Sequence, residues 1–112
     1  GKRAGPGAPP PPTEPTADLP VNEAISHIMG VMTRHRDYAC AGARLAAMVG
    51  VPWVGDNRGL CAEEARRVLE KAKKKTFLLI HPDKCELDLA EAASKALNAT
   101  YNSFDSDLAG AV

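Results

Sequence analysis

The sequence predicts an all-α fold on the strength of three observations. Apolar residues recur at helical spacing in residues 62–80 and again in residues 88–104. Glycine and proline punctuate the chain between the periodic stretches rather than within them. No stretch carries a convincing strand pattern. We therefore expect one helical domain over residues 21–106.

The two ends of the chain are predicted to lie outside that domain. Residues 1–20 are dominated by proline and glycine and include the run Pro9 to Pro12. Such a composition offers little to bury and is typical of a disordered or polyproline-like linker. The proline run would also suit an SH3-type partner, although the linker interpretation is preferred. Residues 107–112 are expected to fray.

Residues 22–49 predict additional helix ahead of the main pair. Asn22 is the expected N-cap, because its side chain can accept a bond from the first free backbone amides. A second helix is expected over residues 37–49, ended by Gly50, and the two could equally form one bent helix. Four apolar residues of the first helix repeat at helical spacing: Ile25, Ile28, Met29 and Met32.

The strongest helical pattern lies in residues 62–80 and follows a glycine-rich loop at residues 50–61. Trp53 of that loop is expected to fold back onto the core. Pro82 ends the helix, because it disfavours helical geometry at the preceding residue. The predicted apolar stripe comprises Ala65, Val68, Leu69, Ala72, Thr76, Leu79 and Ile80.

A last helix is predicted over residues 88–104, with Asp88 as its cap and Glu91 at capping-box spacing. Its apolar stripe starts at Leu89, and Leu97 is expected to face Leu69 across the helix pair. Only residues 81–87 join the two helices, so they should pack as an antiparallel hairpin. The turn at its tip would carry His81, Pro82 and Asp83, beside the lysines of the first helix.

Charge and cysteine usage exclude several function classes. Fourteen basic and fourteen acidic residues give a net charge of zero, so overall charge gives no reason to expect binding to nucleic acid. The three cysteines contain no CxxC pair, which favours reduced thiols over a disulfide or a zinc site. No apolar run is long enough to span a membrane. We expect a cytoplasmic protein that uses no cofactor or metal and catalyses no reaction.

Two phrases of the sequence, LLIHPDK at residues 78–84 and LNATYNSF at residues 97–104, resemble the J-domain family. The likeness covers residues 51–104. The auxilin type looks most similar, because PWVG at residues 52–55 is similar to a phrase that auxilins carry ahead of the same helix. Auxilin-like membership and another divergent J-domain remain about equally favoured.

The resemblance implies a co-chaperone that binds a DnaK-type (heat-shock 70) chaperone and stimulates its ATPase. Auxilin-type membership would add clathrin uncoating, with clathrin-coat proteins contacted through regions upstream of this chain. The residues expected to bind the chaperone are His81, Pro82, Asp83, Lys84, Lys71, Lys74, Lys75 and Leu78.

Several positions depart from the family pattern. Lys73 stands where the family usually has tyrosine, and Glu70 stands where a basic residue is usual. Ser94 replaces an aromatic residue, and we expect Phe77 to fill the space that it opens. These departures keep a second interpretation open, a J-like adaptor that binds a protein without stimulating an ATPase. A basic helical hairpin that binds nucleic acid is a distant third.

Overall fold

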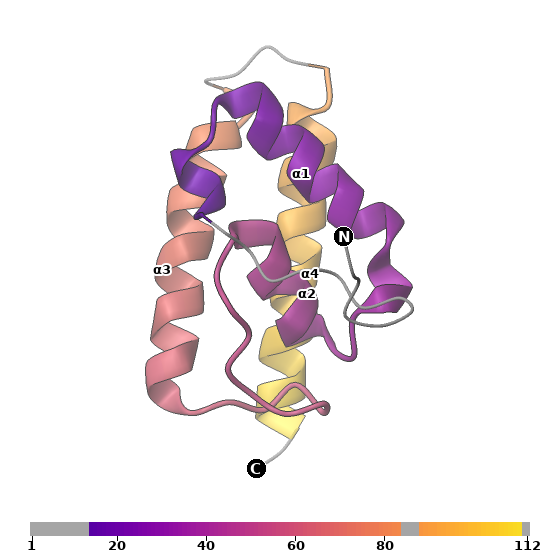
Figure 1. Cartoon of the computed structure of the whole chain (residues 1–112), viewed down its shortest axis with the longest axis vertical. Coiled ribbons are helices and arrows are strands. Elements are labelled where there is room, and N and C mark those ends of the chain that lie inside the picture. The colour runs from indigo at the N-terminus through magenta and orange to yellow at the C-terminus, as the bar shows by residue number, and fades with distance from the viewer. Residues whose placement is uncertain (1–13, 84–87, 111–112) are drawn as a thin grey trace, which may run out of the picture.

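A computed structural model of the chain describes residues 14–83 and 88–110, and every regular element in those ranges is helical. The all-α prediction is therefore confirmed. The order along the chain (Figure 1) is a 3-10 helix at Thr16–Asp18, α1 at Val21–Thr33, a 3-10 helix at His35–Asp37, α2 at Ala41–Val49, α3 at Glu63–Ile80 and α4 at Ala90–Gly110.

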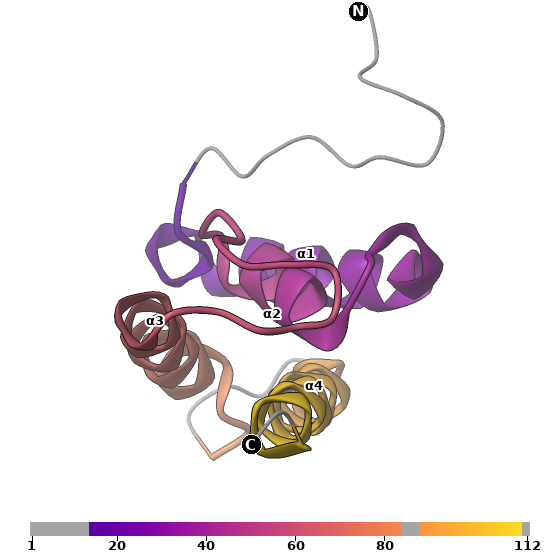
Figure 2. The same ribbon diagram turned by 90° about the horizontal axis from the view of Figure 1, so that it is seen from below.

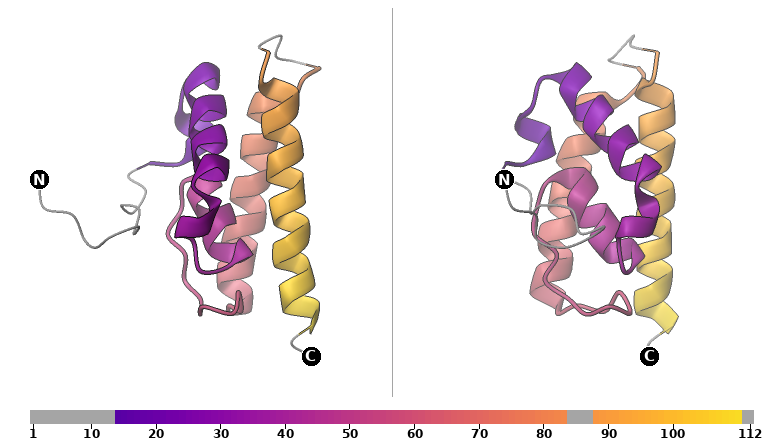
Figure 3. Two further views of the ribbon diagram at one scale, coloured as in Figure 1. Left: turned by 90° about the vertical axis from the view of Figure 1, so that its right-hand side faces the viewer. Right: turned by 45° about the vertical axis from the view of Figure 1, so that its right-hand side comes forward.

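The helices form two layers (Figure 2). The long helices α3 and α4 lie side by side in one layer, and α1 and α2 lie across them in the other. The chain ascends through α3 and descends through α4 in Figure 1, so these two helices are antiparallel. Both views of Figure 3 show the same arrangement. The C-terminal end of α3 therefore lies at one end of the helix pair, close to the start of α4.

The core lies between the two layers and is built almost entirely from aliphatic side chains. Ile28 of α1 and Leu45 and Met48 of α2 are fully buried there. Leu97 and Phe104 reach the same core from α4. Trp53 packs its ring edge-on against Phe104, with ring centroids 6.0 Å apart, so the expectation that the loop tryptophan folds back is confirmed.

The predicted α3 stripe is confirmed at its centre and wrong at one edge. Leu69, Thr76 and Ile80 are buried, and the helix bounds agree with the prediction to within one residue. Val68 was placed on the stripe but is 55% exposed. Leu89 is 50% exposed for a different reason: α4 begins only at Ala90, so Leu89 precedes the helix and Asp88 does not start it.

Residues 107–110 are helical, so the prediction of a frayed end is wrong for them. Leu108 is half-buried and packs against the core. The Asp107 side chain also lies against Gly59, whose φ of 93° is a conformation that glycine adopts without strain. These contacts explain why the last turn of α4 holds beyond Phe104. Residues 111 and 112 lie outside the described part of the chain.

The linker prediction is wrong for residues 14–20. Thr16 is fully buried, and its hydroxyl donates to the Met48 carbonyl at 2.6 Å. That carbonyl belongs to the last turn of α2, where helix carbonyls lack partners within the helix. Gly50 takes the left-handed conformation that ends α2 and lies against the backbone of Pro15. The proline run at residues 9–12 lies outside the described residues.

The upstream segment forms two separate helices rather than one bent helix. Pro20 precedes the first turn of α1 as its N-cap, so Asn22 lies inside the helix and does not cap it. The α2 helix starts four residues later than predicted, and the Cys40 sulfur accepts from the Ala43 amide at its N-terminus. The ring of His27 donates to the Ala47 carbonyl at 2.6 Å and so links α1 to α2.

Leu97→Ala tests the position of the core. The leucine side chain is fully buried between the layers, so its truncation should lower the free energy of unfolding by roughly 2–5 kcal/mol. Leu69→Ala should behave alike. Lys74→Ala, on the exposed side of α3, should change stability by no more than about 0.5 kcal/mol. Urea denaturation measures all three, and equal midpoints would show that the assignment of faces is wrong.

Candidate functional site

The turn after α3 holds three of the residues that the sequence marked for function. His81 ends the helix with φ −57° and ψ 131°, an extended conformation imposed by the proline that follows. The Asp83 amide donates to Nδ1 of His81 at 3.1 Å. The His81 side chain is 32% exposed whereas that of Asp83 is 89% exposed. The turn thus gives the imidazole a hydrogen-bond partner and leaves the carboxylate open to solvent.

The turn is anchored to α4 as well as to α3. Ile80 is fully buried, and its carbonyl accepts a hydrogen bond from the Ser94 hydroxyl at 3.4 Å. The bond supplies a partner to one of the last carbonyls of α3, which the helix itself leaves free. Ser94 is itself buried. Ser94 therefore connects the C-terminal end of α3 to α4.

The outward face of α3 carries the remaining predicted residues that the structure describes. Lys71, Lys74 and Lys75 are exposed, and Leu78 is 52% exposed. Lys71, Lys74 and Leu78 border a hollow of about 730 Å³ on this face. The face leads along α3 toward the His81–Asp83 turn, so basic, apolar and acidic groups follow one another. Lys84, which was predicted to join them, lies outside the described residues.

Lys73 has a different environment from its three neighbours. It is half-buried, and its ammonium lies 5.2 Å from the ring centroid of Phe77 and 5.1 Å from that of Tyr101. Both distances fall within the range of a cation–π contact. Phe77 also meets the His81 ring edge-on, with centroids 5.0 Å apart. Phe77 also packs against the core, whereas the Ser94 hydroxyl bonds to the Ile80 carbonyl. That Phe77 fills the space beside Ser94 stays a prediction.

An ionic network connects α3 to α4 next to the 730 Å³ hollow, which Glu70 and Tyr101 also line. Arg66 donates to Glu70 at 3.0 Å and to Asp105 of α4 at 2.9 Å. The Tyr101 hydroxyl of α4 donates to the same Glu70 at 2.9 Å. The hydrogen bonds from Arg66 and Tyr101 lower the pKa of Glu70 below its ordinary value. Burial and the bond to Glu70 raise the pKa of Tyr101.

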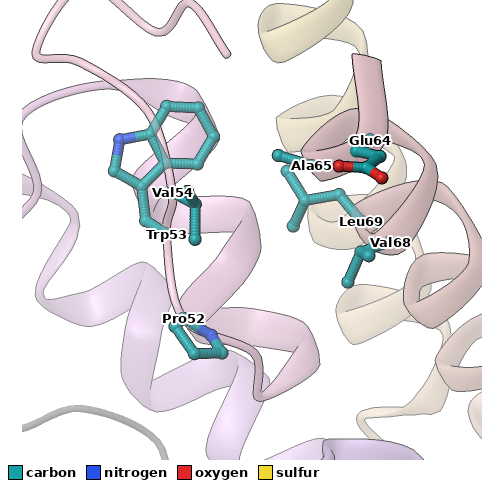
Figure 4. Close-up of a pocket in the computed structure, with 7 residues that line it drawn as sticks. All are labelled: Pro52, Trp53, Val54, Glu64, Ala65, Val68 and Leu69. Carbon is teal, nitrogen blue, oxygen red and sulfur yellow. The ribbon is translucent and has the colours of Figure 1, made fainter. Parts of the chain in front are cut away.

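A second hollow, of about 360 Å³, lies between the loop after α2 and the first half of α3 (Figure 4). Pro52, Trp53 and Val54 line it from the loop, and Val68 faces them from α3. Its surface is mainly apolar. This hollow explains the exposure of Val68, because the loop stops short of covering that edge of the helix. No pattern in the sequence indicates this hollow, because Val68 fits the buried stripe equally well.

The described residues provide no set of ligands for a metal ion: no three histidine, cysteine or acidic side chains gather within residues 14–83 and 88–110. Cys40 and Cys61 are half-buried free thiols, and burial raises the pKa of Cys61. In the same part of the chain, no helix combines the length and the hydropathy that crossing a membrane requires.

Comparison with protein-family models, with curated proteins and with solved structures finds no match for this chain. The candidate site therefore rests on its own geometry. We call the exposed side of α3 that carries Lys71, Lys74, Lys75 and Leu78 the lysine face. The structure places the His81–Asp83 turn at one end of it, as the sequence predicted. The contacts of Lys73 and the bonds of Glu70 could not be predicted from the sequence, because each involves Tyr101 of α4.

Glu70→Gln tests the ionic network through pH. Because the folded-state pKa of Glu70 is lowered, its contribution to stability is present above the pKa of the unfolded chain, about 4.3, and is lost as the pH falls through the lower folded value. The wild-type chain should lose more stability than Glu70→Gln between about pH 6 and pH 3. Thermal melts across that range measure the difference. Parallel stability curves for the two proteins would contradict the network.

Proposed function

We propose that this chain is a J-domain co-chaperone that binds a DnaK-type chaperone and stimulates its ATPase without catalysing a reaction itself. The observation that carries the proposal is the His81-Pro82-Asp83 turn at the end of a basic helix that packs antiparallel to a second helix. The tripeptide His-Pro-Asp by itself is common by chance and identifies no family. Its position at the end of the lysine face makes the resemblance to a J-domain more specific.

The turn has the properties that a trigger needs. Pro82 removes conformational freedom from the backbone, and the Asp83 amide donates a hydrogen bond to the imidazole. The Asp83 carboxylate is left almost fully exposed. An arginine of a partner can meet such a carboxylate with two parallel hydrogen bonds. An arginine–carboxylate pair gains strength when an interface excludes water. Asp83 could thereby favour one conformation of the partner.

The lysine face has the properties of a docking surface. Lys71, Lys74 and Lys75 project from α3, and Leu78 adds apolar area between them and the turn. An acidic surface on the chaperone would be attracted to these charges and would bury the leucine on contact. The arrangement suits one partner that touches both the face and the turn.

A second candidate is a J-like adaptor that binds a chaperone or another protein without stimulating hydrolysis. The observation that favours it is the altered basic face. Glu70 stands where J-domains usually have a basic residue. The Lys73 ammonium makes cation–π contacts with two aromatic rings and is therefore not presented to a partner. Auxilin-type activity in clathrin uncoating remains a proposal that rests on the resemblance of residues 52–55, 78–80 and 97–104 to that type.

His81→Gln and Asp83→Asn test the trigger. Both substitutions lie in an exposed turn, so thermal midpoints should remain close to wild type, whereas stimulation of single-turnover ATP hydrolysis by the DnaK-type partner should be abolished. His35→Gln and Asp37→Asn make the same chemical changes at exposed residues of another element. They should stimulate normally. If His81→Gln and Asp83→Asn stimulate like wild type, the co-chaperone proposal fails.

Removal of the docking charges gives a separate test. Lys71→Ala, Lys74→Ala and Lys75→Ala should each weaken binding to the chaperone, and added salt should weaken the wild-type complex, because exposed charges are screened over about 10 Å at 0.1 M. Lys95→Ala removes an exposed lysine of α4 that pairs with Glu91 and should leave affinity unchanged. Calorimetric titrations at two salt concentrations decide the matter. Salt-independent binding would favour the apolar adaptor.

A further inference from the structure

The side chain of Phe77 connects the candidate trigger to the body of the helix pair. Its ring meets the His81 ring at an interplanar angle of 87° with centroids 5.0 Å apart, a favourable edge-to-face geometry. Phe77 lies one helical turn before His81, so the two rings share a side of the helix end. The ring of Phe77 therefore contributes to covering the imidazole, which is 32% exposed although it belongs to a surface turn.

Phe77 is linked to α4 through Lys73. The Lys73 ammonium lies 5.2 Å from the Phe77 ring centroid and 5.1 Å from that of Tyr101, which belongs to α4. Tyr101 is fixed at its other end by the hydrogen bond from its hydroxyl to Glu70. A continuous set of contacts thus runs from α4 through Lys73 and Phe77 to His81.

The imidazole needs this support because its other restraint is weak. The Asp83 amide donates to Nδ1, which requires that nitrogen to carry no proton. Asp83 is exposed, so water competes for its amide and the turn alone cannot hold one ring orientation firmly. The ring of Phe77 restricts rotation of the imidazole. Restricted rotation favours the orientation in which Nδ1 accepts from the Asp83 amide and the opposite ring nitrogen carries the proton. It thereby opposes the other tautomer, which the Asp83 carboxylate, 3.7 Å from Nδ1, would favour.

We propose that Phe77 is a positioning residue that sets the orientation and tautomer of the His81 ring, and that Lys73 serves it as a bridge to Tyr101 rather than as a docking charge. The value of this arrangement for ATPase stimulation rests on the proposed co-chaperone function. The positioning itself does not, because it is a property of the free chain. Packing of α4 against α3 is then coupled to the geometry of the turn.

The test compares Phe77→Leu with Phe77→Tyr in the full chain. Leucine keeps an apolar side chain but removes the ring, whereas tyrosine keeps the ring. The nitrogen chemical shifts of His81, read by NMR at a pH where the ring is neutral, report its tautomer directly. Phe77→Leu should shift His81 toward a mixture of tautomers, and Phe77→Tyr should restore the wild-type signals. A purely structural role for Phe77 would alter the thermal midpoint without changing the tautomer.

Lys73→Gln should disturb the His81 signals in the same direction, and Lys73→Arg, which keeps the cation, should not. Lys95→Gln is the matched control for the loss of one charge and should leave His81 unchanged. Unaltered His81 signals in both Phe77→Leu and Lys73→Gln would overturn the proposal, whatever their stability.

Stimulation of a DnaK-type chaperone supplies the functional arm. Phe77→Leu should lower the maximal rate of ATP hydrolysis roughly two- to tenfold, the range that loss of one aromatic pair implies, with little change in the concentration giving half-maximal stimulation. Phe77→Tyr should recover it. A wild-type chain that never stimulates would refute the co-chaperone proposal while the NMR result still decides the positioning. An altered tautomer together with unchanged stimulation would refute the link from Phe77 to the trigger.

Discussion

The point at which α3 ends is the constraint from which the candidate site follows. Pro82 denies His81 a helical backbone, so the helix stops at Ile80 and the chain must turn there. The buried Ile80 and the bond from Ser94 to its carbonyl hold that end against α4. If α3 continued for another turn, the imidazole and the carboxylate would lie on a helix surface instead of at the end of a helix pair.

The layer of α1 and α2 makes this arrangement possible, because two helices alone would leave their apolar stripes open. Leu45, Met48 and Ile28 cover the inner faces of α3 and α4 and leave the lysine face outside. The Arg66–Glu70–Tyr101 network connects α3 and α4 a second time, away from the bond between Ser94 and Ile80. Exposed ion pairs contribute little stability each, so we assign this network chiefly an orienting role.

Much of the fold could be predicted from local pattern, because α3 and the all-α class depend on periodicity and on proline. The helical state of residues 107–110 could not, because Asp107 is held by a contact with Gly59, about fifty residues away in sequence. The burial of Thr16 could not be predicted for a similar reason, because its hydroxyl donates to the Met48 carbonyl, which is distant in sequence. Val68 matched the stripe and was misplaced, since periodicity cannot tell which edge of a stripe a loop will cover.

The candidate site also contains features that could be predicted from the sequence and features that could not. The His81–Asp83 turn and the exposed lysines could be predicted because both depend on residues close in sequence. The place of Lys73 between two rings could not, since one of them, Tyr101, comes from α4. The four lysines within residues 71–75 look alike in sequence. Only the packing distinguishes Lys73, which bridges the helices, from the three that face solvent.

We propose that one partner contacts both the lysine face and the turn. NMR resonance mapping of the isotope-labelled chain during titration with an ATP-bound DnaK-type chaperone can detect such a surface. If one partner does so, the perturbed resonances should belong to one continuous surface comprising Lys71, Lys74, Lys75, Leu78, His81 and Asp83. Perturbations confined to the hollow beside Trp53 and Val68, or none at saturating chaperone, would contradict it.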